Sequence, residues 1–333
     1  YFLAHYGYWL YAASVLAKNN ETWREETQEL FTSLARDIAN PSAKDPWFPR
    51  YRHFDWYAGH SWASGLMAFT DGRNQESSSE CLNAWYGLYL YAKSIEDKNM
   101  QRTAASLLAH EMRAAKTYWH STSDSSVYPE GFSQNKGVGM IWGDKVDYNT
   151  WFGAGVVYAL GINMMPFTPL SEIYLDQKWM SEAYPVLHKG LQVGYTDDWS
   201  AVVYMAEAVV DAKKSWEHMK KIGHFDDGMS RSNAIWWIAT RPPFNPHHPI
   251  TLDFDSPEPY DPSSPHHAAG ASRPGLVELH RTLIGLLLLV VLLVGVGLAI
   301  YTVLLPKLMR EEGQGLLGQN PVSYDTSGTV NVF

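Results

Sequence analysis

Two glutamates separated by three serines are the residues of this sequence best suited to chemistry. Glu76 and Glu80 lie in the stretch 71–80, which reads DGRNQESSSE. If both residues are helical, their carboxylates lie on one face, one turn apart, where like charges repel each other. The alternative is a solvated helix start, where acidic residues suit the helix dipole. The pattern therefore indicates either paired carboxylates that handle protons or an ordinary charged helix terminus.

The residues around this pair favour a carbohydrate site. The flanking segments hold aromatic and amide side chains rather than a Lys/Glu surface, and the candidate site residues among them are Trp56, His60, Trp62, Asn74 and Gln75. Trp142 is a further candidate as a sugar platform. Sugar rings stack on aromatic faces, amides hydrogen-bond hydroxyl groups or water, and carboxylates transfer the protons of glycosidic cleavage. Each tryptophan has packing in the core as its alternative role.

Composition excludes several classes of function. The 333 residues carry a net charge of −9 without a basic stripe, so we expect no nucleic acid as a partner. Cys81 is the sole cysteine, which rules out a disulfide within the chain and a Cys-based zinc site. A catalytic thiol is conceivable there, although a helical cysteine on an apolar face is usually a packing residue. No His/Asp/Glu set has metal-ligand spacing, so no metal and no cofactor are expected.

The elements that must position these residues are mainly helices. Helical spacing of apolar residues predicts helices at 1–17, 21–39, 80–97, 98–120, 149–164, 171–194 and 197–219, and another that ends near 240. The segment 134–147 is the only plausible hairpin. Repeated antiparallel helix pairs predict an all-α domain over residues 1–241, arranged as a toroid of helices.

The character of the sequence changes after Arg241. Residues 242–281 are rich in Pro, Ser and His and lack periodicity, which predicts a flexible stalk. Its two His-His pairs are interpreted as part of this linker, with adventitious metal binding as the alternative.

An apolar run follows the stalk. Residues 283–305 contain no charge, and at 1.5 Å per residue such a run crosses a bilayer core of about 30 Å. We therefore predict one transmembrane helix at 282–305, a single-pass membrane protein, and a short cytosolic tail at 306–333. The charges that flank the run are nearly balanced, so they do not fix its orientation.

The motifs carry a family resemblance. Residues 5–241 resemble the C-terminal catalytic part of family 81 glycoside hydrolases, which are endo-β-1,3-glucanases. The matching stretches are His5-Tyr6-Gly7-Tyr8, Asp45-Pro46-Trp47-Phe48-Pro49-Arg50, the segment from Phe54 to Trp62, the segment from Asp71 to Glu80, and Trp142-Gly143-Asp144-Lys145. The resemblance implies an (α/α)6 barrel, hydrolysis of internal β-1,3-glucosidic bonds, inversion at the anomeric carbon, and β-1,3-glucan as the partner.

The resemblance also implies roles for individual residues. Glu76 matches the general base that activates water, and Glu80 matches the glutamate that supports water and substrate. His5 and Tyr6 lie in a matching motif and are expected at the substrate, although His5, like His60, could equally pack in the core. An inverting enzyme holds its acid and base about 6.5–9.5 Å apart. Glu76 and Glu80 as helical neighbours are too close for that pair, so the acid must come from elsewhere.

The sequence departs from the family at this acid. The family has an Asp four residues before the His of the His-Tyr-Gly-Tyr motif, and that position here is Tyr1. A tyrosine with a pKa near 10 does not readily protonate a leaving oxygen. Asp55 and Asp147 are the possible substitutes, with substrate hydrogen bonding or loop capping as their alternative roles.

Three hypotheses follow from these observations. The chain begins at Tyr1 without Met, and the family's barrel starts well upstream, so we expect an incomplete barrel from a longer protein. The first hypothesis is a membrane-anchored endo-β-1,3-glucanase whose sequence here is truncated and whose catalytic domain faces the outside. The second is a catalytically impaired, membrane-anchored β-glucan-binding protein. The third is an unrelated α-toroid enzyme, which the match from Phe54 to Glu80 disfavours.

Overall fold

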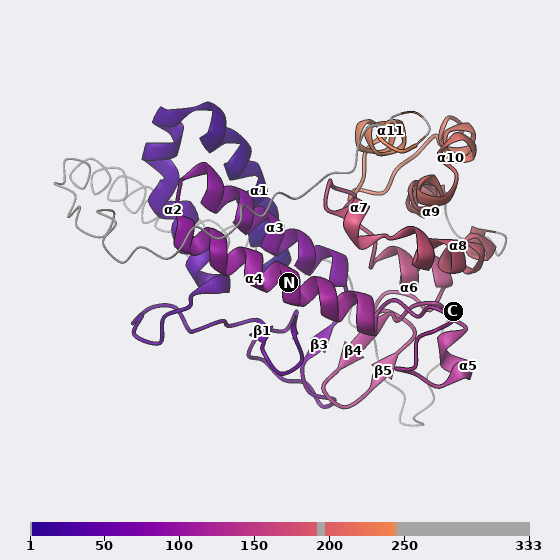
Figure 1. Cartoon of the computed structure of the whole chain (residues 1–333), viewed down its shortest axis with the longest axis horizontal. Helices are drawn as coiled ribbons and strands as arrows, with labels where there is room; N and C mark the ends of the chain where they lie inside the picture. The colour runs from indigo at the N-terminus through magenta and orange to yellow at the C-terminus, as the bar shows by residue number, and fades with distance from the viewer. Residues whose placement is uncertain (1, 192–196, 243, 245–333) are drawn as a thin grey trace, which may run out of the picture. The chain divides into compact units, whose positions relative to one another are not determined.

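The computed structural model describes residues 2–191, 197–242 and 244, and these residues are mostly helical (Figure 1). The predicted all-α fold class is therefore confirmed for the described residues. The helices are α1 (Phe2–Asn19), α2 (Glu21–Ala39), α3 (Ser78–Ser94), α4 (Lys98–Tyr118), α5 (Glu130–Ser133), α6 (Val156–Gly161), α7 (Ser171–Tyr174), α8 (Gln177–Leu191), α9 (Asp197–Val210), α10 (Ala212–Met219) and α11 (Arg231–Ala239).

Short strands lie between the helices. They are β1 (Phe54–Asp55), β2 (His60–Ser61), β3 (Asn74–Gln75), β4 (Met140–Trp142) and β5 (Val146–Asp147). The β1 and β2 strands form an antiparallel hairpin, and β3, β4 and β5 form an antiparallel sheet in that order. The pairing of β4 with β5 confirms the hairpin predicted within 134–147. The expectation that it is the only hairpin is wrong, because β1 and β2 form another. In the sheet, Asn74 lies opposite Trp142, so residues far apart in the sequence meet beside the start of α3.

Side-chain caps explain where several helices begin. The side chains of Asn20, Asp97 and Ser230 each accept a hydrogen bond from the backbone N–H three residues later, at 3.0, 2.9 and 3.1 Å. These bonds open α2, α4 and α11. Each cap satisfies one of the backbone donors that the first helical turn leaves without an intrahelical partner.

The α3 helix is the centre of the N-terminal half, where it packs against α1 and α4. Nearly all of its side chains are buried, including Trp85 at 0 % exposure. Its contact with α1 is close because small residues face each other there. An added Cβ at Gly87 would lie 2.3 Å from the backbone oxygen of Gly7, and one at Gly7 would lie 2.2 Å from Ala84 Cα. Positions 7 and 87 of this crossing have room only for glycine.

A second group of helices contains α6, α8, α9, α10 and α11, which contact one another in the C-terminal half. Hydrogen bonds join this group to the start of α3. The Ser78 hydroxyl lies 2.8 Å from Asn163 Oδ1 and 2.7 Å from the Tyr174 hydroxyl. The start of α3 is therefore anchored to both halves of the described structure.

Three predicted helices differ from the observed ones. In the segment predicted as one helix at 149–164, only α6 is helical, because Thr150 closes a tight loop by donating its N–H and hydroxyl to the Gly153 oxygen. The prediction at 171–194 is wrong in extent, since the structure has the separate helices α7 and α8 there. The prediction at 197–219 covers α9 and α10, which Asp211 separates by capping α10.

The C-terminal predictions lie almost wholly outside the described residues. These are the stalk at 242–281, the transmembrane helix at 282–305 and the tail at 306–333, of which the structure describes only residues 242 and 244. Within the part of the chain that is described, no helix combines the length and the apolar character that crossing a membrane requires.

Candidate active site

Glu76 occupies the short link between β3 and α3, rather than the helix itself. Its side chain is buried, with 4 % of the residue exposed. The backbone N–H of Trp151 donates a 2.9 Å hydrogen bond to Glu76 Oε1. The arrangement of two glutamates on one helical face is therefore wrong, because α3 begins only at Ser78. A charge-assisted bond from the backbone fixes the direction of the Glu76 carboxylate.

Glu80 lies in the first turn of α3 and receives a hydrogen bond from α1. The Tyr8 hydroxyl donates to Glu80 Oε1 at 2.6 Å. Burial, and next the negative charge of Glu80, raise the pKa of Tyr8, so this hydroxyl stays protonated and can always donate. Glu80 opens onto a pocket of about 340 Å³, which Tyr8 and Pro166 also line. Tyr8 was not predicted at the site, although it ends the His5-Tyr6-Gly7-Tyr8 motif.

The serines between the two glutamates have a structural role. The hydroxyls of Ser77 and Ser79 donate to the backbone oxygen of Ile162 at 2.9 and 3.1 Å. Together with the bonds of Ser78, they tie the start of α3 to the segment that follows α6. Small polar residues are needed here because the backbones approach closely and buried hydroxyls require partners. These bonds hold both glutamates in place.

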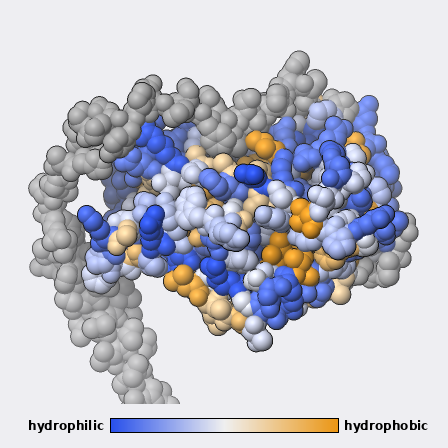
Figure 2. Space-filling view, turned by 60° about the horizontal axis from the view of Figure 1, so that its bottom comes forward, coloured by the Kyte–Doolittle hydropathy of each residue, from blue (hydrophilic) through white to orange (hydrophobic). Residues whose placement is uncertain are grey.

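An aromatic cluster lies beside Glu76. It consists of Phe69, Trp142 and Trp151, and the Trp151 ring is 5.3 Å from Trp142 and 6.2 Å from Phe69 in edge-on contacts. Trp142, the predicted sugar platform, is 8 % exposed, whereas Trp151 is 55 % exposed. Apolar side chains also reach the surface on the side where the strands lie (Figure 2). Trp151 is thus an accessible ring whose own backbone binds Glu76, and no sequence spacing marks it.

The Asp55 carboxylate accepts hydrogen bonds from its own hairpin and from residues that follow it. Its Oδ2 accepts from Arg73 at 2.6 Å and from Trp62 Nε1 at 3.0 Å, and its Oδ1 accepts from the backbone of Tyr57 and Ala58. Burial alone would raise the pKa of this carboxyl, but the hydrogen bonds and the Arg73 charge outweigh burial and lower it. A lowered pKa suits an ionised cap and ion-pair partner.

Asp147 likewise has close partners, in β5. It accepts a hydrogen bond from Trp142 Nε1 at 2.8 Å, and Lys145 Nζ lies 3.4 Å from it. Lys145 also pairs with Asp71 at 2.9 Å. These contacts link the hairpin of β4 and β5 to the turn before β3. Asp147 therefore lies in the same sheet as the residues leading to Glu76.

Most other predicted residues lie in the two small sheets. Asn74 and Gln75 form β3 and are buried, with Gln75 donating to the Ser77 oxygen at 3.0 Å. Trp62 is 6 % exposed and lies under Arg73, whose guanidinium is 5.2 Å from its ring. The β3 strand is joined to the hairpin of β1 and β2 because Ala63 donates its N–H to the Asn74 oxygen at 2.8 Å.

The remaining predicted residues are more distant or buried. His60 is 3 % exposed, contacts the Trp119 ring at 5.1 Å, and has a pKa lowered by burial, so it is a neutral core residue. Trp56 is 46 % exposed and packs edge-on against Phe54. On α1, His5 is exposed and Tyr6 is half-buried.

Glu111 is a buried acid that sequence reasoning missed. It lies on α4 at 0 % exposure and accepts hydrogen bonds from the Ser61 backbone at 2.8 Å and from Trp85 Nε1 at 3.1 Å. Burial raises its pKa to about 7, although these hydrogen bonds oppose the shift. The sequence pattern that could have identified Glu111 as buried is its position on the apolar face of α4, between Leu108 and Ala115. Glu111 ties the hairpin of β1 and β2 to the helical core.

A nucleophilic cysteine and a metal site are two other chemistries that this part of the chain could support. Cys81 is buried on α3, and burial raises the pKa of its thiol, which disfavours a nucleophilic thiolate. In the segments that the structure describes, no group of three or more His, Cys, Asp or Glu residues could hold a metal ion.

Known proteins are similar to this chain over most of its described residues. The family model described as Glycosyl hydrolase family 81 C-terminal domain matches residues 2–238. A glucan endo-1,3-beta-D-glucosidase of Arthroderma benhamiae is 32 % identical over 243 residues, which are 71 % of this chain and 26 % of that protein. A glucan endo-1,3-beta-D-glucosidase of Glycine max is 33 % identical over 246 residues, covering 71 % of this chain and 36 % of that protein.

A solved structure is similar as well. It is a mutant glycoside hydrolase family 81 protein from Clostridium thermocellum, with a TM-score of 0.64 and 29 % identity. The match covers 72 % of this chain and 33 % of that one. The chain therefore spans about a quarter to a third of the length of these relatives.

Proposed function

The chain belongs to glycoside hydrolase family 81, and we propose that it hydrolyses internal β-1,3-glucosidic bonds of β-glucan with inversion at the anomeric carbon. The names of its relatives support this activity, since they are glucan endo-1,3-beta-D-glucosidases. The observation that carries the proposal is the Glu76 carboxylate, which the Trp151 backbone orients at 2.9 Å beside an exposed indole ring. An oriented carboxylate next to an aromatic platform is what base-catalysed attack on a bound sugar requires.

In the proposed mechanism, Glu76 is the general base. It takes a proton from a water molecule, whose oxygen attacks the anomeric carbon from the face opposite the leaving group. A general acid protonates the glycosidic oxygen as its bond to that carbon breaks. Glu80, held by the Tyr8 hydroxyl, orients the water and the substrate. One bond to oxygen forms and one breaks, so the anomeric configuration inverts.

The resemblance places the family's general acid one residue before α1, which begins at Phe2. Leu3 and Ala4 line a small cavity together with Glu80, so the beginning of this helix is close to the second glutamate. The family acid corresponds to Tyr1, which lies outside the described residues. The hydrogen bonds and lowered pKa of Asp55 support a role in fixing the hairpin. We propose the same positioning role for Asp147.

The first test is hydrolysis of laminarin by the 333-residue chain, compared with Glu76→Gln. We expect the parent to release reducing ends and the variant to lose at least about a hundredfold in rate, the size of a general-base contribution. Polarimetry or NMR of the first products should detect the α-anomer from the β-linked substrate. Equal rates for a folded variant and the parent would contradict the role of Glu76, and a β-anomer would contradict inversion.

A second candidate function is a catalytically impaired, membrane-anchored protein that binds β-glucan. The observation that favours it is Tyr1 at the position where the family has an acid. In that case, a gel that contains β-glucan should retard both the parent and Glu76→Gln. Neither protein should release reducing ends. The two functions thus differ in a single assay.

We also propose that the helix pairs belong to an (α/α)6 barrel carried on a membrane. The support is the family, the stalk composition of 242–281 and the uncharged apolar run at 283–305. The catalytic domain then faces the outside, where wall polymers are found, and 306–333 form a cytosolic tail. Alkaline carbonate should leave the chain in the membrane fraction and release a variant that lacks 283–305. Protease added to intact cells should degrade the domain; a protected domain would contradict the orientation.

A further inference from the structure

The turn between α1 and α2 holds a sequence motif that the proposed hydrolysis does not use. Asn20-Glu21-Thr22 is an Asn-X-Thr triplet, the acceptor pattern for an N-linked glycan in exported proteins when X is not Pro. The 333 residues contain no second such triplet, since Asn40-Pro41-Ser42 has Pro at X. Short triplets also arise by chance, so the contacts around Asn20 determine whether a glycan fits there.

Asn20 is the single residue between the two helices, with α1 ending at Asn19 and α2 starting at Glu21 (Figure 1). Its backbone N–H donates to the Leu16 oxygen at 2.9 Å, and its backbone oxygen accepts from the Arg24 N–H at 3.0 Å. These bonds fix the turn, while the residue itself is exposed. A bulky substituent on this side chain can therefore extend into solvent without displacing either helix.

The side-chain amide of Asn20 uses its oxygen and leaves its nitrogen available. Its Oδ1 accepts the 3.0 Å bond from the Trp23 N–H that caps α2. Its Nδ2 donates no hydrogen bond within the described part of the chain, whereas Nδ2 of the adjacent Asn19 donates to the Val15 oxygen at 2.7 Å. An N-linked glycan is attached to Nδ2, and the glycosylated amide keeps its oxygen. Asn20 can therefore carry a glycan and still cap the helix.

Thr22 supplies the hydroxyl that the acceptor pattern requires. It is exposed in the first turn of α2, and its hydroxyl has no hydrogen-bond partner among the residues that the structure describes. The surface beside it is polar, since Glu21 and Glu25 are also exposed. The two side chains that define the triplet are thus both accessible on one turn of the structure.

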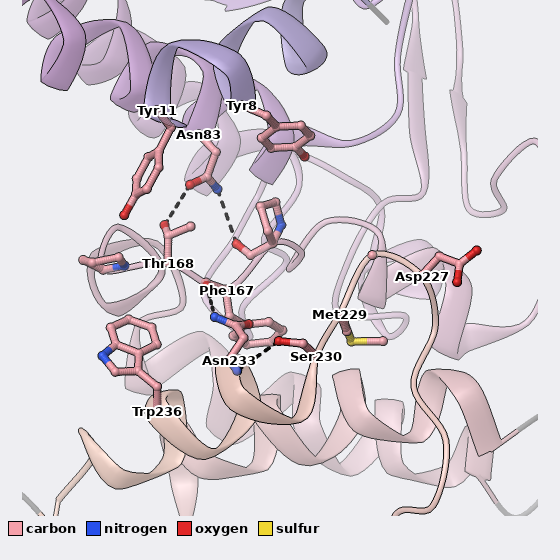
Figure 3. Close-up of a pocket in the computed structure, with 13 residues that line it drawn as sticks. Tyr8, Tyr11, Asn83, Phe167, Thr168, Asp227, Met229, Ser230, Asn233 and Trp236 are labelled. Atoms are coloured by element: carbon pink, nitrogen blue, oxygen red, sulfur yellow. Dashed lines mark hydrogen bonds between the residues drawn. The ribbon is translucent and has the colours of Figure 1, made fainter. Parts of the chain in front are cut away.

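The turn lies well away from the candidate active site along α1. Tyr8 and Tyr11 are the residues of this helix that line a pocket of about 690 Å³ next to that site (Figure 3). Asn20 comes twelve residues after Tyr8, which is about 18 Å along the helix axis at 1.5 Å per residue. A glycan on Asn20 therefore leaves Glu80 and its pocket open.

We propose that Asn20 carries an N-linked oligosaccharide. The inference rests on the proposed orientation of the domain, because the transferase for such glycans acts on the side of the membrane that becomes the outside. In the attachment step, Asn20 Nδ2 bonds to the anomeric carbon of an oligosaccharide carried on a lipid diphosphate. The bond from that carbon to the diphosphate oxygen breaks. The diphosphate leaves with the electron pair, and Nδ2 loses one proton to a base of the transferase.

The glycan also gives the apolar end of α1 a polar cover. Val15 and Leu16 are 52 % and 49 % exposed, and Leu16 is hydrogen-bonded directly to the Asn20 backbone. Exposed apolar side chains favour self-association, and a surface glycan is bulky and solubilising. The sugar chain thus lies beside the apolar residues that most need a polar neighbour.

The experiment expresses the 333-residue chain behind a cleavable secretion signal in a eukaryotic cell. Peptide-N-glycosidase F should lower the apparent mass of the parent in one step and convert Asn20 to an aspartate, which peptide mass spectrometry detects. Thr22→Ser keeps the triplet and should behave like the parent. Thr22→Ala and Asn20→Asp should show no shift, although both keep a side-chain oxygen at position 20 for the cap. Hydrophobic-interaction chromatography should retain Thr22→Ala longer than Thr22→Ser.

The contrary results point to different parts of the inference. An unshifted parent whose domain is degraded by protease on intact cells would overturn glycosylation of Asn20, while the orientation and the hydrolysis still stand. An unshifted parent whose domain is protected would overturn the proposed orientation together with the glycan. A shift that persists in Thr22→Ala would place the glycan at another residue. Equal retention of Thr22→Ala and Thr22→Ser would overturn the covering of α1.

Discussion

Tyr8 donates a 2.6 Å hydrogen bond from its hydroxyl to Glu80 Oε1 across 72 positions of the sequence. This bond connects the first described helix to the segment that carries both glutamates. The donor stays protonated because burial and the Glu80 charge raise the pKa of Tyr8. The carboxylate of Glu80 is therefore held in one direction by a residue that takes no proton itself.

Tyr8→Phe should lower kcat while keeping the fold. A hydrogen bond to a charged group contributes about 1.5–3 kcal/mol, which corresponds to roughly ten- to a hundredfold in rate. Laminarin hydrolysis measures the effect. Tyr128→Phe is the matched control, because it also removes a hydroxyl that donates a hydrogen bond, in this case to the Tyr118 oxygen. A Tyr8→Phe protein with the parent's kcat would show that Glu80 needs no such support.

Trp151→Ala should weaken glucan binding without displacing Glu76. The bond to Glu76 comes from the backbone N–H, which alanine retains, whereas the exposed indole is removed. We expect KM for laminarin to rise about three- to tenfold with a much smaller change in kcat. Trp47→Ala, at a residue that is 81 % exposed, serves as the control. A large fall in kcat with KM unchanged would mean that the ring acts on Glu76 rather than on the sugar.

Glu111 should make stability depend on pH between about 4.5 and 7. Its pKa is about 7 in the folded protein and near 4.5 when unfolded, so the folded state binds more protons in this range. The free energy of unfolding therefore falls as pH rises from 4.5 to 7, by an upper bound of about 3 kcal/mol. The contribution is fully present below pH 4.5 and lost above pH 7.

The measurement is urea unfolding of the parent and Glu111→Gln at several pH values from 4.5 to 8. Glutamine keeps an oxygen for the Ser61 and Trp85 donors but does not titrate. The difference in unfolding free energy between the two proteins should change across this range and be flat above pH 7.5. Parallel pH profiles for the two proteins would rule out Glu111 as the source.

Gly87→Ala should destabilise the protein by about 2 kcal/mol, since its new Cβ would lie 2.3 Å from the Gly7 oxygen and force α1 away from α3. Thermal unfolding should show a midpoint several degrees lower. Gly131→Ala is the matched control, because no atom lies within 4 Å of the Cβ it would add. An equal midpoint for both variants would mean that the helix crossing can widen without cost.

The sequence predicted the helices with clear caps and apolar faces, and it predicted the segment that carries the glutamates. It placed Glu76 one turn before Glu80 on a helix, which is wrong because β3 pairs with β4 and holds Glu76 ahead of α3. Such pairing joins residues almost 70 positions apart, and no local pattern encodes it. The family resemblance supplied the roles of the glutamates, which helical periodicity alone left open.

The site residues that could not be predicted from the sequence have one feature in common. Tyr8 and Trp151 gain their positions only when distant elements pack, so one tyrosine or tryptophan in an aromatic-rich chain looks like any other. Trp142 was the expected platform, but it uses its indole N–H to bind Asp147 and lies mostly under its neighbours. Which ring faces solvent depends on tertiary packing rather than on residue type.

The glycine crossing of α1 and α3 also sets the longitudinal register of the two helices. A slide of α1 by one turn would move it about 5.4 Å along its axis, which is twice the length of the bond between Tyr8 and Glu80. The backbone contact of Gly7 with Gly87 leaves one alignment at which the helices approach this closely. The contact between these two glycines therefore fixes the axial register of α1 on α3. In that register Tyr8 reaches Glu80, and Tyr11 lines the neighbouring pocket.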